Sequence, residues 1–171
     1  VLMFNLIIVK VDYKYCDYLR KFDYRVSYNK DKKELRPFVG VLFRIGDMEY
    51  FAPLTSPKPK HLKMRNTIDF FRIDNGKLGA INFNNMIPVT KKNYEIINLN
   101  KKYIHKKEIQ YQALLNNQYT WLNEYKDEII KRATKLYNKY THNRLPLNIQ
   151  NRCCNYKILE EACLKYNTVS V

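Results

Sequence analysis

The fold is decided by residues 38–54, which read FVGVLFRIGDMEYFAPL. Two apolar and aromatic runs are separated here by only Gly46 and Asp47, a spacing typical of a β-hairpin with a two-residue turn. If the turn is that tight, Phe38 lies opposite Thr55. The sequence therefore predicts a pair of antiparallel strands in the first third of the chain.

The same pairing makes a prediction about side chains at the open end of the hairpin. Arg36 falls opposite Pro57, which places it beside Ser56 and Lys58. A β-bulge in either strand would shift this register.

The flanking sequence predicts an α+β domain built on a twisted antiparallel sheet with helices around it. Asn75 and Gly76 mark a second tight turn, and Asp12 and Asn155 are candidate helix N-caps. The connections between strands are too short for crossover helices, which favours antiparallel pairing. Strands are expected at residues 6–11, 68–74, 78–83, 86–89 and 94–98, and apolar stripes at helical spacing occur at residues 15–22, 111–122, 129–140 and 159–166.

Length and composition exclude several classes of protein. The 171 residues suit a single domain, which we expect to span residues 1–171. An apolar fraction of 46% is too high for a disordered tail, and charged residues interrupt every apolar run before it could span a membrane. The four glycines form neither a dinucleotide-binding fingerprint nor a P-loop. Nucleotide-cofactor enzymes of those types are therefore disfavoured, and we expect no cofactor.

The cysteines and the N-terminus indicate the compartment. The four cysteines contain no C-x-x-C pair, which is typical of a reducing cytoplasm. No charged region followed by an apolar run and a cleavage site opens the chain. Val1 and Leu2 precede the first methionine, and we interpret them as residues left by cloning.

The chain is strongly basic, with 31 Lys and Arg against 16 Asp and Glu. Residues 51–68 contain no acidic residue. A polyanion is the favoured partner, although a basic surface that only confers solubility is the alternative. The cations and the histidine of this stretch that we expect to contact RNA are Lys58, Lys60, His61, Lys63 and Arg65.

Residues 53–58, which read PLTSPK, contain several functional side chains close together. Thr55 and Ser56 offer two hydroxyls, and Lys58 and the neighbouring Arg36 offer cationic donors. Donors of these types suit a phosphate group, and Arg can bind one through two hydrogen bonds. A polar strand end with solvated lysines is the alternative interpretation.

Other candidate contacts also have structural explanations, which the sequence favours for Gln118 and His61. Tyr28 could stack on a base or be an ordinary surface residue. Gln118 lies on an apolar helix face that also carries Tyr111, where its amide needs either a ligand or a hydrogen bond to the sheet. His61 is interpreted either as an RNA contact or as an exposed loop residue without a role. Glu160 and Glu161 are interpreted as surface charges.

The sequence gives little support for a metal-dependent active site or for a serine hydrolase. The three histidines are scattered, and Asp69 and Asp74 are isolated, so no metal site is predicted. Ser56 lacks the G-x-S-x-G turn of an α/β-hydrolase nucleophile.

Four stretches resemble, in order and spacing, the ToxN/AbiQ family of type III toxin–antitoxin endoribonucleases. The resemblance covers essentially the whole chain. It rests on F-x-G-x-x-x-x-I at residues 38–45, YFAPLTSPK at 50–58, LGAINFNNMIPV at 78–89 and NYKILEE at 155–161.

The resemblance implies a compact fold like that of the MazF/Kid toxins and metal-independent RNA cleavage. It places the active site at Thr55, Ser56 and Lys58, with Arg36 where other members have Lys, and it makes Tyr28 the counterpart of a family tyrosine. It further implies inhibition by a pseudoknotted repeat RNA that the toxin processes, in a larger assembly of protein and RNA. The protein alone is expected to be a monomer, and the toxin to confer abortive infection against phage.

The chemistry of metal-free RNA scission agrees with these residue types. The 2′-OH of the substrate acts as nucleophile, which leaves 2′,3′-cyclic phosphate and 5′-OH ends and requires of the protein only proton transfer and charge stabilisation. Lys58, near Arg36 and Lys60, is the candidate base or electrostatic stabiliser, while Arg36 cannot act as a base near neutral pH. Two alternatives stay open, which are an RNA-binding module without turnover and a toxin of the same fold that targets a protein.

Overall fold

The centre of the fold is an antiparallel sheet. The structure is a computed structural model that describes residues 4–27 and 36–168. Within these residues the strand order is β5-β6-β4-β2-β1-β8, while β3 and β7 also pair with β4. The strands are β1 (Ile7–Val11), β2 (Pro37–Gly40), β3 (Arg44–Ile45), β4 (Met48–Thr55), β5 (Phe70–Arg72), β6 (Ala80–Asn82), β7 (Ile87–Val89) and β8 (Tyr94–Ile96).

Strand β4 organises the sheet because it pairs with four other strands. Its first half pairs with β3 and β7, and its second half pairs with β2 and β6. Seven of its eight residues are buried, as expected for a strand covered on both faces. The exception is Thr55, the last residue, where the strand reaches the surface.

The predicted first hairpin is present, but its register is not uniform. Next to the turn, Ile45 pairs with Met48 as predicted. Further along, Phe38 pairs with Pro53, so the prediction that it lies opposite Thr55 is wrong. The strand expected over residues 38–45 is interrupted between β2 and β3.

A bulge of two residues explains the shift. Tyr50 accepts the amide of Leu42 at 3.0 Å and donates its own amide to the carbonyl of Phe43 at 3.0 Å. The extra residues turn the side chain of Leu42 into the core, where it is buried. Continued beyond Phe38, the observed register places Arg36 across from Thr55, which corrects its predicted position opposite Pro57.

The second hairpin, β5–β6, is also present, with a longer connection than predicted. Phe71 pairs with Ile81, and residues 73–79 form the loop in place of a two-residue turn at Asn75 and Gly76. Asp74, Asn75 and Gly76 all have positive φ, which curls the chain before it enters β6. The expected strands at residues 86–89 and 94–98 are confirmed as β7 and β8.

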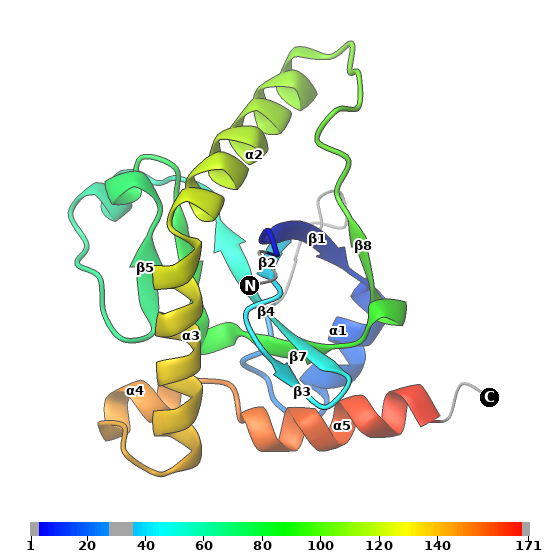
Figure 1. Cartoon of the computed structure of the whole chain (residues 1–171), viewed down its shortest axis with the longest axis vertical. Coiled ribbons are helices and arrows are strands. Elements are labelled where there is room, and N and C mark those ends of the chain that lie inside the picture. Colours follow the sequence, from blue (N-terminus) through cyan, green and yellow to red (C-terminus); the bar gives the residue numbers. More distant parts are fainter. Residues whose placement is uncertain (1–3, 28–35, 169–171) are drawn as a thin grey trace.

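Four helices carry the predicted apolar stripes, which confirms the α+β class, whereas the short helix α4 was not predicted. Asp12 caps the first helix by accepting the amide of Lys14, and Asn155 accepts the amide of Ile158 near the start of the last one. Tyr125 separates the two long helices, and the second continues beside the sheet while the first extends outward (Figure 1). The helices are α1 (Tyr13–Arg20), α2 (Lys106–Glu124), α3 (Lys126–Thr141), α4 (Leu147–Arg152) and α5 (Tyr156–Thr168).

Glu160 corrects a prediction about the surface. Its side chain is buried with only 7% of the residue exposed, whereas Glu161 is exposed as expected. The Glu160 carboxylate accepts hydrogen bonds from the hydroxyls of Tyr50 at 2.6 Å and Tyr137 at 2.7 Å. These hydrogen bonds compensate the carboxylate for its lost hydration. They also connect α5 to α3 and β4.

No described helix combines the length and apolar character needed to cross a membrane.

Candidate active site

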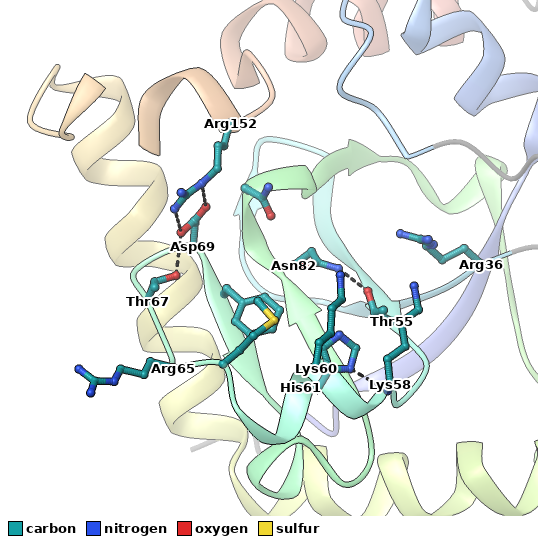
Figure 2. A pocket seen from close by; sticks show the side chains of 13 residues that line it. Arg36, Thr55, Lys58, Lys60, His61, Arg65, Thr67, Asp69, Asn82 and Arg152 are labelled. Atoms are coloured by element: carbon teal, nitrogen blue, oxygen red, sulfur yellow. Dashed lines mark hydrogen bonds and ion pairs between the residues drawn. The ribbon is translucent and has the colours of Figure 1, made fainter. Parts of the chain in front are cut away.

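A cleft of about 440 Å³ opens at the surface end of β4, between β4 and the loop that precedes β5. Its wall carries one acidic residue, Asp69, and several cations, so the cleft is strongly electropositive. The cationic residues that line it are Arg36, Lys58, Lys60, Arg65 and Arg152. Figure 2 shows Thr55, Lys58 and Arg36 together on one side of this cleft.

Thr55 presents its hydroxyl at the point where β4 ends. The side-chain amide of Asn82, on the paired strand β6, donates a hydrogen bond to the Thr55 hydroxyl oxygen. Because a hydroxyl can also donate, and no described residue accepts from Thr55, its proton is available to an anion in the cleft. Asn82 was not predicted as a site residue, although it lies within the motif at residues 78–89.

Two glycines of the β5–β6 loop hold the segment that follows Thr55. Gly79 has φ +98°, and a Cβ atom there would lie 1.9 Å from the carbonyl oxygen of Thr55. Gly76 has φ +92°, and its Cβ would lie 2.3 Å from the carbonyl oxygen of His61. Both positions therefore require glycine for conformation and for space, and together they fix the backbone of residues 55–61 against the hairpin.

His61 is a structural partner of Lys58. Only 2% of the residue is exposed, so the expectation of an exposed loop histidine is wrong, yet it also lines the cleft. Its Nδ1 accepts the backbone amide of Lys58 at 3.1 Å, which requires a neutral ring with the proton on Nε2. Burial, together with the charges of Lys60 and Lys58, lowers the pKa of His61 below its ordinary value.

Arg36 completes this side of the cleft. It is half-buried, and burial lowers its pKa from the ordinary value. A guanidinium keeps its charge under all physiological conditions, so Arg36 contributes a permanent positive charge near Thr55 and Lys58.

Several predicted contacts lie elsewhere. Ser56 and Lys63 are exposed and do not line the cleft. Gln118 is 1% exposed and donates its amide to the carbonyl of Leu78 at 2.9 Å, so its partner is structural as expected, although Leu78 lies in the β5–β6 loop and not in the sheet. Tyr111 is half-buried on the same helix, α2, and does not line the cleft either. Tyr28 lies outside the described residues.

The far side of the cleft carries residues that sequence reasoning missed. Asp69, just before β5, accepts two hydrogen bonds from the guanidinium of Arg152, at 3.0 and 2.8 Å, and one from the hydroxyl of Thr67 at 2.8 Å. The only available signal was an acidic residue directly after a basic stretch. Arg152 lies 83 positions away in sequence, and no local pattern connects the two.

The described residues contain no group of three or more His, Cys, Asp or Glu arranged to hold a metal ion. What the cleft offers to a ligand is a hydroxyl, ammonium and guanidinium groups, all of which donate hydrogen bonds to phosphate oxygens.

Comparison with known proteins identifies the family. A profile of the ToxN toxins of type III toxin–antitoxin systems matches residues 7–164. The chain belongs to this family.

Curated relatives and solved structures agree with this membership. Endoribonuclease ToxN of Bacillus thuringiensis subsp. kurstaki is 35% identical over 157 residues, which cover 90% of this chain and 80% of the relative. Endoribonuclease AbiQ of Lactococcus lactis subsp. lactis is 29% identical, with 92% and 87% covered. A toxin solved in work on selective inhibition by a non-coding RNA pseudoknot superposes with a TM-score of 0.80 at 32% identity, over 96% of this chain and 99% of the other.

Proposed function

We propose that this ToxN-family chain is an endoribonuclease that cuts RNA in the cleft at the end of β4 without a metal ion. The observation that carries the proposal is the convergence of Thr55, Lys58 and Arg36 on one cleft, in a chain whose curated relatives are endoribonucleases. We further propose that residues 1–171 act as one toxin domain and that it works in the cytoplasm.

The proposed reaction is transesterification at phosphorus. The 2′-oxygen of the substrate forms a bond to the adjacent phosphorus while the bond from phosphorus to the 5′-oxygen breaks. The proton of the 2′-OH leaves to a base, and the 5′-oxygen gains a proton, which gives 2′,3′-cyclic phosphate and 5′-OH ends. Lys58 assists as base or as electrostatic stabiliser, and Arg36 stabilises the charge that develops on the phosphorane.

The hydroxyls have a separate role in this proposal. Thr55, oriented by Asn82, donates its free proton to a non-bridging phosphate oxygen. Ser56 is exposed beside it and becomes a second donor when RNA covers the segment. Lys60, His61, Lys63 and Arg65 contact the flanking strand, and Tyr28 and Tyr111 remain predicted RNA contacts from the sequence alone. Gln118 is buried and is not proposed as a contact.

The proposed inhibitor is a structured repeat RNA. One structural relative comes from work on toxin inhibition by an RNA pseudoknot, and another, AbiQ, is described as a lactococcal anti-phage endoribonuclease. We extend both properties to this chain. Its antitoxin is a repeat RNA that the toxin itself processes, the two form a larger assembly, and released toxin cuts cellular or phage RNA during abortive infection.

The test is incubation of the purified protein with cellular RNA in the presence of EDTA, followed by mapping of the ends. We expect undiminished cleavage and 2′,3′-cyclic phosphate ends, and a substrate with a 2′-deoxy nucleotide at the cut should resist. Loss of cleavage in EDTA that Mg²⁺ restores would refute metal independence. Tight RNA binding without any cleavage would favour the RNA-binding module.

A further inference from the structure

The pair Asp69–Arg152 forms a rigid donor group on the cleft wall that faces Thr55, Lys58 and Arg36 (Figure 2). Asp69 is 2% exposed, and the guanidinium of Arg152 binds it through Nε and Nη2. Two parallel hydrogen bonds fix the plane of the guanidinium as well as its position. Arg152 is therefore oriented before any ligand arrives.

Arg152 nevertheless stays open to solvent. Its side chain is 48% exposed, compared with 3% for Asp69. Among the described residues its Nη1 has no hydrogen-bond partner, so part of the guanidinium remains unused. This unused part of the guanidinium is available to a ligand in the cleft, which Arg152 lines.

The Asp69–Arg152 pair offers a ligand hydrogen-bond donors and almost no free acceptor atoms. Both oxygens of Asp69 are occupied, one by Arg152 alone and the other by Arg152 and Thr67. A ligand that meets this wall therefore needs acceptor atoms. An exocyclic amino group of a nucleobase would find at most the second lone pair of the buried Oδ2 of Asp69, whereas a phosphate presents only acceptors and so matches the donors of Arg152.

We propose that Arg152 binds the backbone phosphate of a nucleotide that flanks the one being cut. Asp69 is its positioning residue, and the site serves as a second, sequence-independent phosphate subsite. The inference rests on the proposed function, because it assumes that the scissile phosphate lies beside Thr55 and Lys58.

The apolar part of the cleft wall supports this arrangement. Met64 and Phe70 also line the cleft, and both are partly exposed. An apolar side chain and an aromatic ring can contact a base face without selecting its sequence. A single RNA strand can therefore cross the cleft with one phosphate at Lys58 and a neighbouring phosphate at Arg152.

The experiment combines protein variants with neutral phosphates. A short RNA substrate is synthesised with a methylphosphonate at one position at a time on either side of the cut, and kcat/KM is measured for each. With the wild-type protein, we expect one flanking position to lower kcat/KM by about 10- to 100-fold, the size of a lost charge-assisted hydrogen bond. With Arg152→Met, the all-phosphate substrate should be slower by a similar factor, and the same methylphosphonate should cause no further loss.

Two controls separate folding from binding. The double variant Asp69→Asn with Arg152→Met avoids leaving a buried carboxylate without its partner and should give the same result as Arg152→Met. Arg132→Met is the matched control, because Arg132 also pairs with an acid, Glu128, but does not line the cleft. In Arg132→Met, the methylphosphonate should lower kcat/KM by the same factor as in the wild type.

The outcomes distinguish the inference from the proposed function. Cleavage by the wild type, combined with unchanged methylphosphonate effects in the folded Arg152 variants, would overturn the phosphate subsite alone. Absence of cleavage by the wild type would instead refute the endoribonuclease and, with it, the premise of the subsite.

Discussion

Lys58 has a defined backbone position although its side chain is exposed. The ring of His61 accepts its amide, and Gly76 and Gly79 hold the segment on either side of it. A donor on a segment that is already ordered loses less conformational entropy when it binds the transition state. The effect of Lys58 should therefore be seen mainly in turnover.

The first prediction at this scale concerns Ser56→Ala and Lys58→Ala. Lys58→Ala should lower cleavage by about 100-fold or more, because one preorganised donor contributes about 3 kcal/mol to the transition state. Ser56→Ala should lower cleavage less, because the Ser56 hydroxyl is exposed and does not line the cleft. RNA binding should fall much less. The measurement is single-turnover cleavage beside a binding titration, with Lys135→Ala as control, because Lys135 is an exposed lysine of α3 that does not line the cleft and is not among the proposed RNA contacts. Full activity of Lys58→Ala would show that another residue carries the reaction.

A second prediction follows from the lowered pKa of His61. In the folded protein the pKa of His61 is lowered, whereas the unfolded chain protonates this residue at its ordinary pKa of 6.5. As the pH falls below that value, the unfolded state binds more protons, so the free energy of unfolding decreases. In His61→Asn, an amide oxygen can accept the Lys58 amide without titrating.

Thermal unfolding at several pH values between 7 and 5 tests this prediction. The wild type should lose more stability across this interval than His61→Asn, since carboxylates titrate equally in both proteins. Parallel curves for the two proteins would contradict the assignment of the pH dependence to His61.

Sequence could identify only those site residues that are close together along the chain. Thr55 and Lys58 belong to one hexapeptide, and Arg36 follows from strand pairing even though the predicted register was wrong. Arg152 and the burial of Glu160 could not be predicted in this way, because both depend on contacts with residues far away in sequence. Such partners become visible only when the helices are packed on the sheet.

At the scale of elements, hydrophobic patterning located most strands and the four longer helices, but not the short helix α4 or the distortions that shape the site. Both distortions bring two backbone segments close together. The two-residue bulge before β3 places Leu42 against Tyr50, and the extended β5–β6 loop places Gly79 against Thr55. Alternating hydrophobicity reports which face of a strand is buried, and it carries little information about such insertions. The loop matters for function because its glycines contact the segment of Thr55.

Gly79→Ala tests the role of this contact. A methyl group 1.9 Å from the Thr55 carbonyl oxygen must displace the end of β4, and the positive φ adds strain. Gly46→Ala is the matched control, because Gly46 also has a positive φ of 59° but nothing lies within 4 Å of its Cβ position. Backbone strain alone should cost Gly46→Ala about 1 kcal/mol.

Gly79→Ala should lose about 1–3 kcal/mol more than this control. It should also cleave RNA at least tenfold more slowly under conditions where both variants are folded, because Thr55 is moved. Chemical denaturation and single-turnover cleavage provide the two readouts. Equal stability and equal activity of the two alanine variants would show that the close approach of Gly79 to Thr55 is not important.

The charge of the whole molecule extends well beyond the cleft. The net charge is +15, and Lys91 and Lys92 line a second hollow of about 420 Å³, which also contains Asp47 and the Arg44–Glu49 ion pair. The outward end of α2 adds exposed lysines at positions 106 and 107 (Figure 1). A large RNA can therefore contact several faces of the protein at once, and each phosphate contact releases counterions.

The prediction at this scale is that a structured repeat RNA inhibits the toxin more strongly than its charge alone can explain. The positive charge of the protein attracts all RNAs of the same length equally. Selectivity must therefore come from RNA shape and from unpaired bases stacked on aromatic side chains. The measurement is a titration with the repeat RNA encoded beside the gene and with a scrambled RNA of the same length, at several salt concentrations. Both affinities should fall steeply with salt, but only the repeat should bind tightly and block cleavage near physiological salt. Equal affinities without inhibition would reject the RNA antitoxin, because they would leave electrostatic attraction as the sole source of binding.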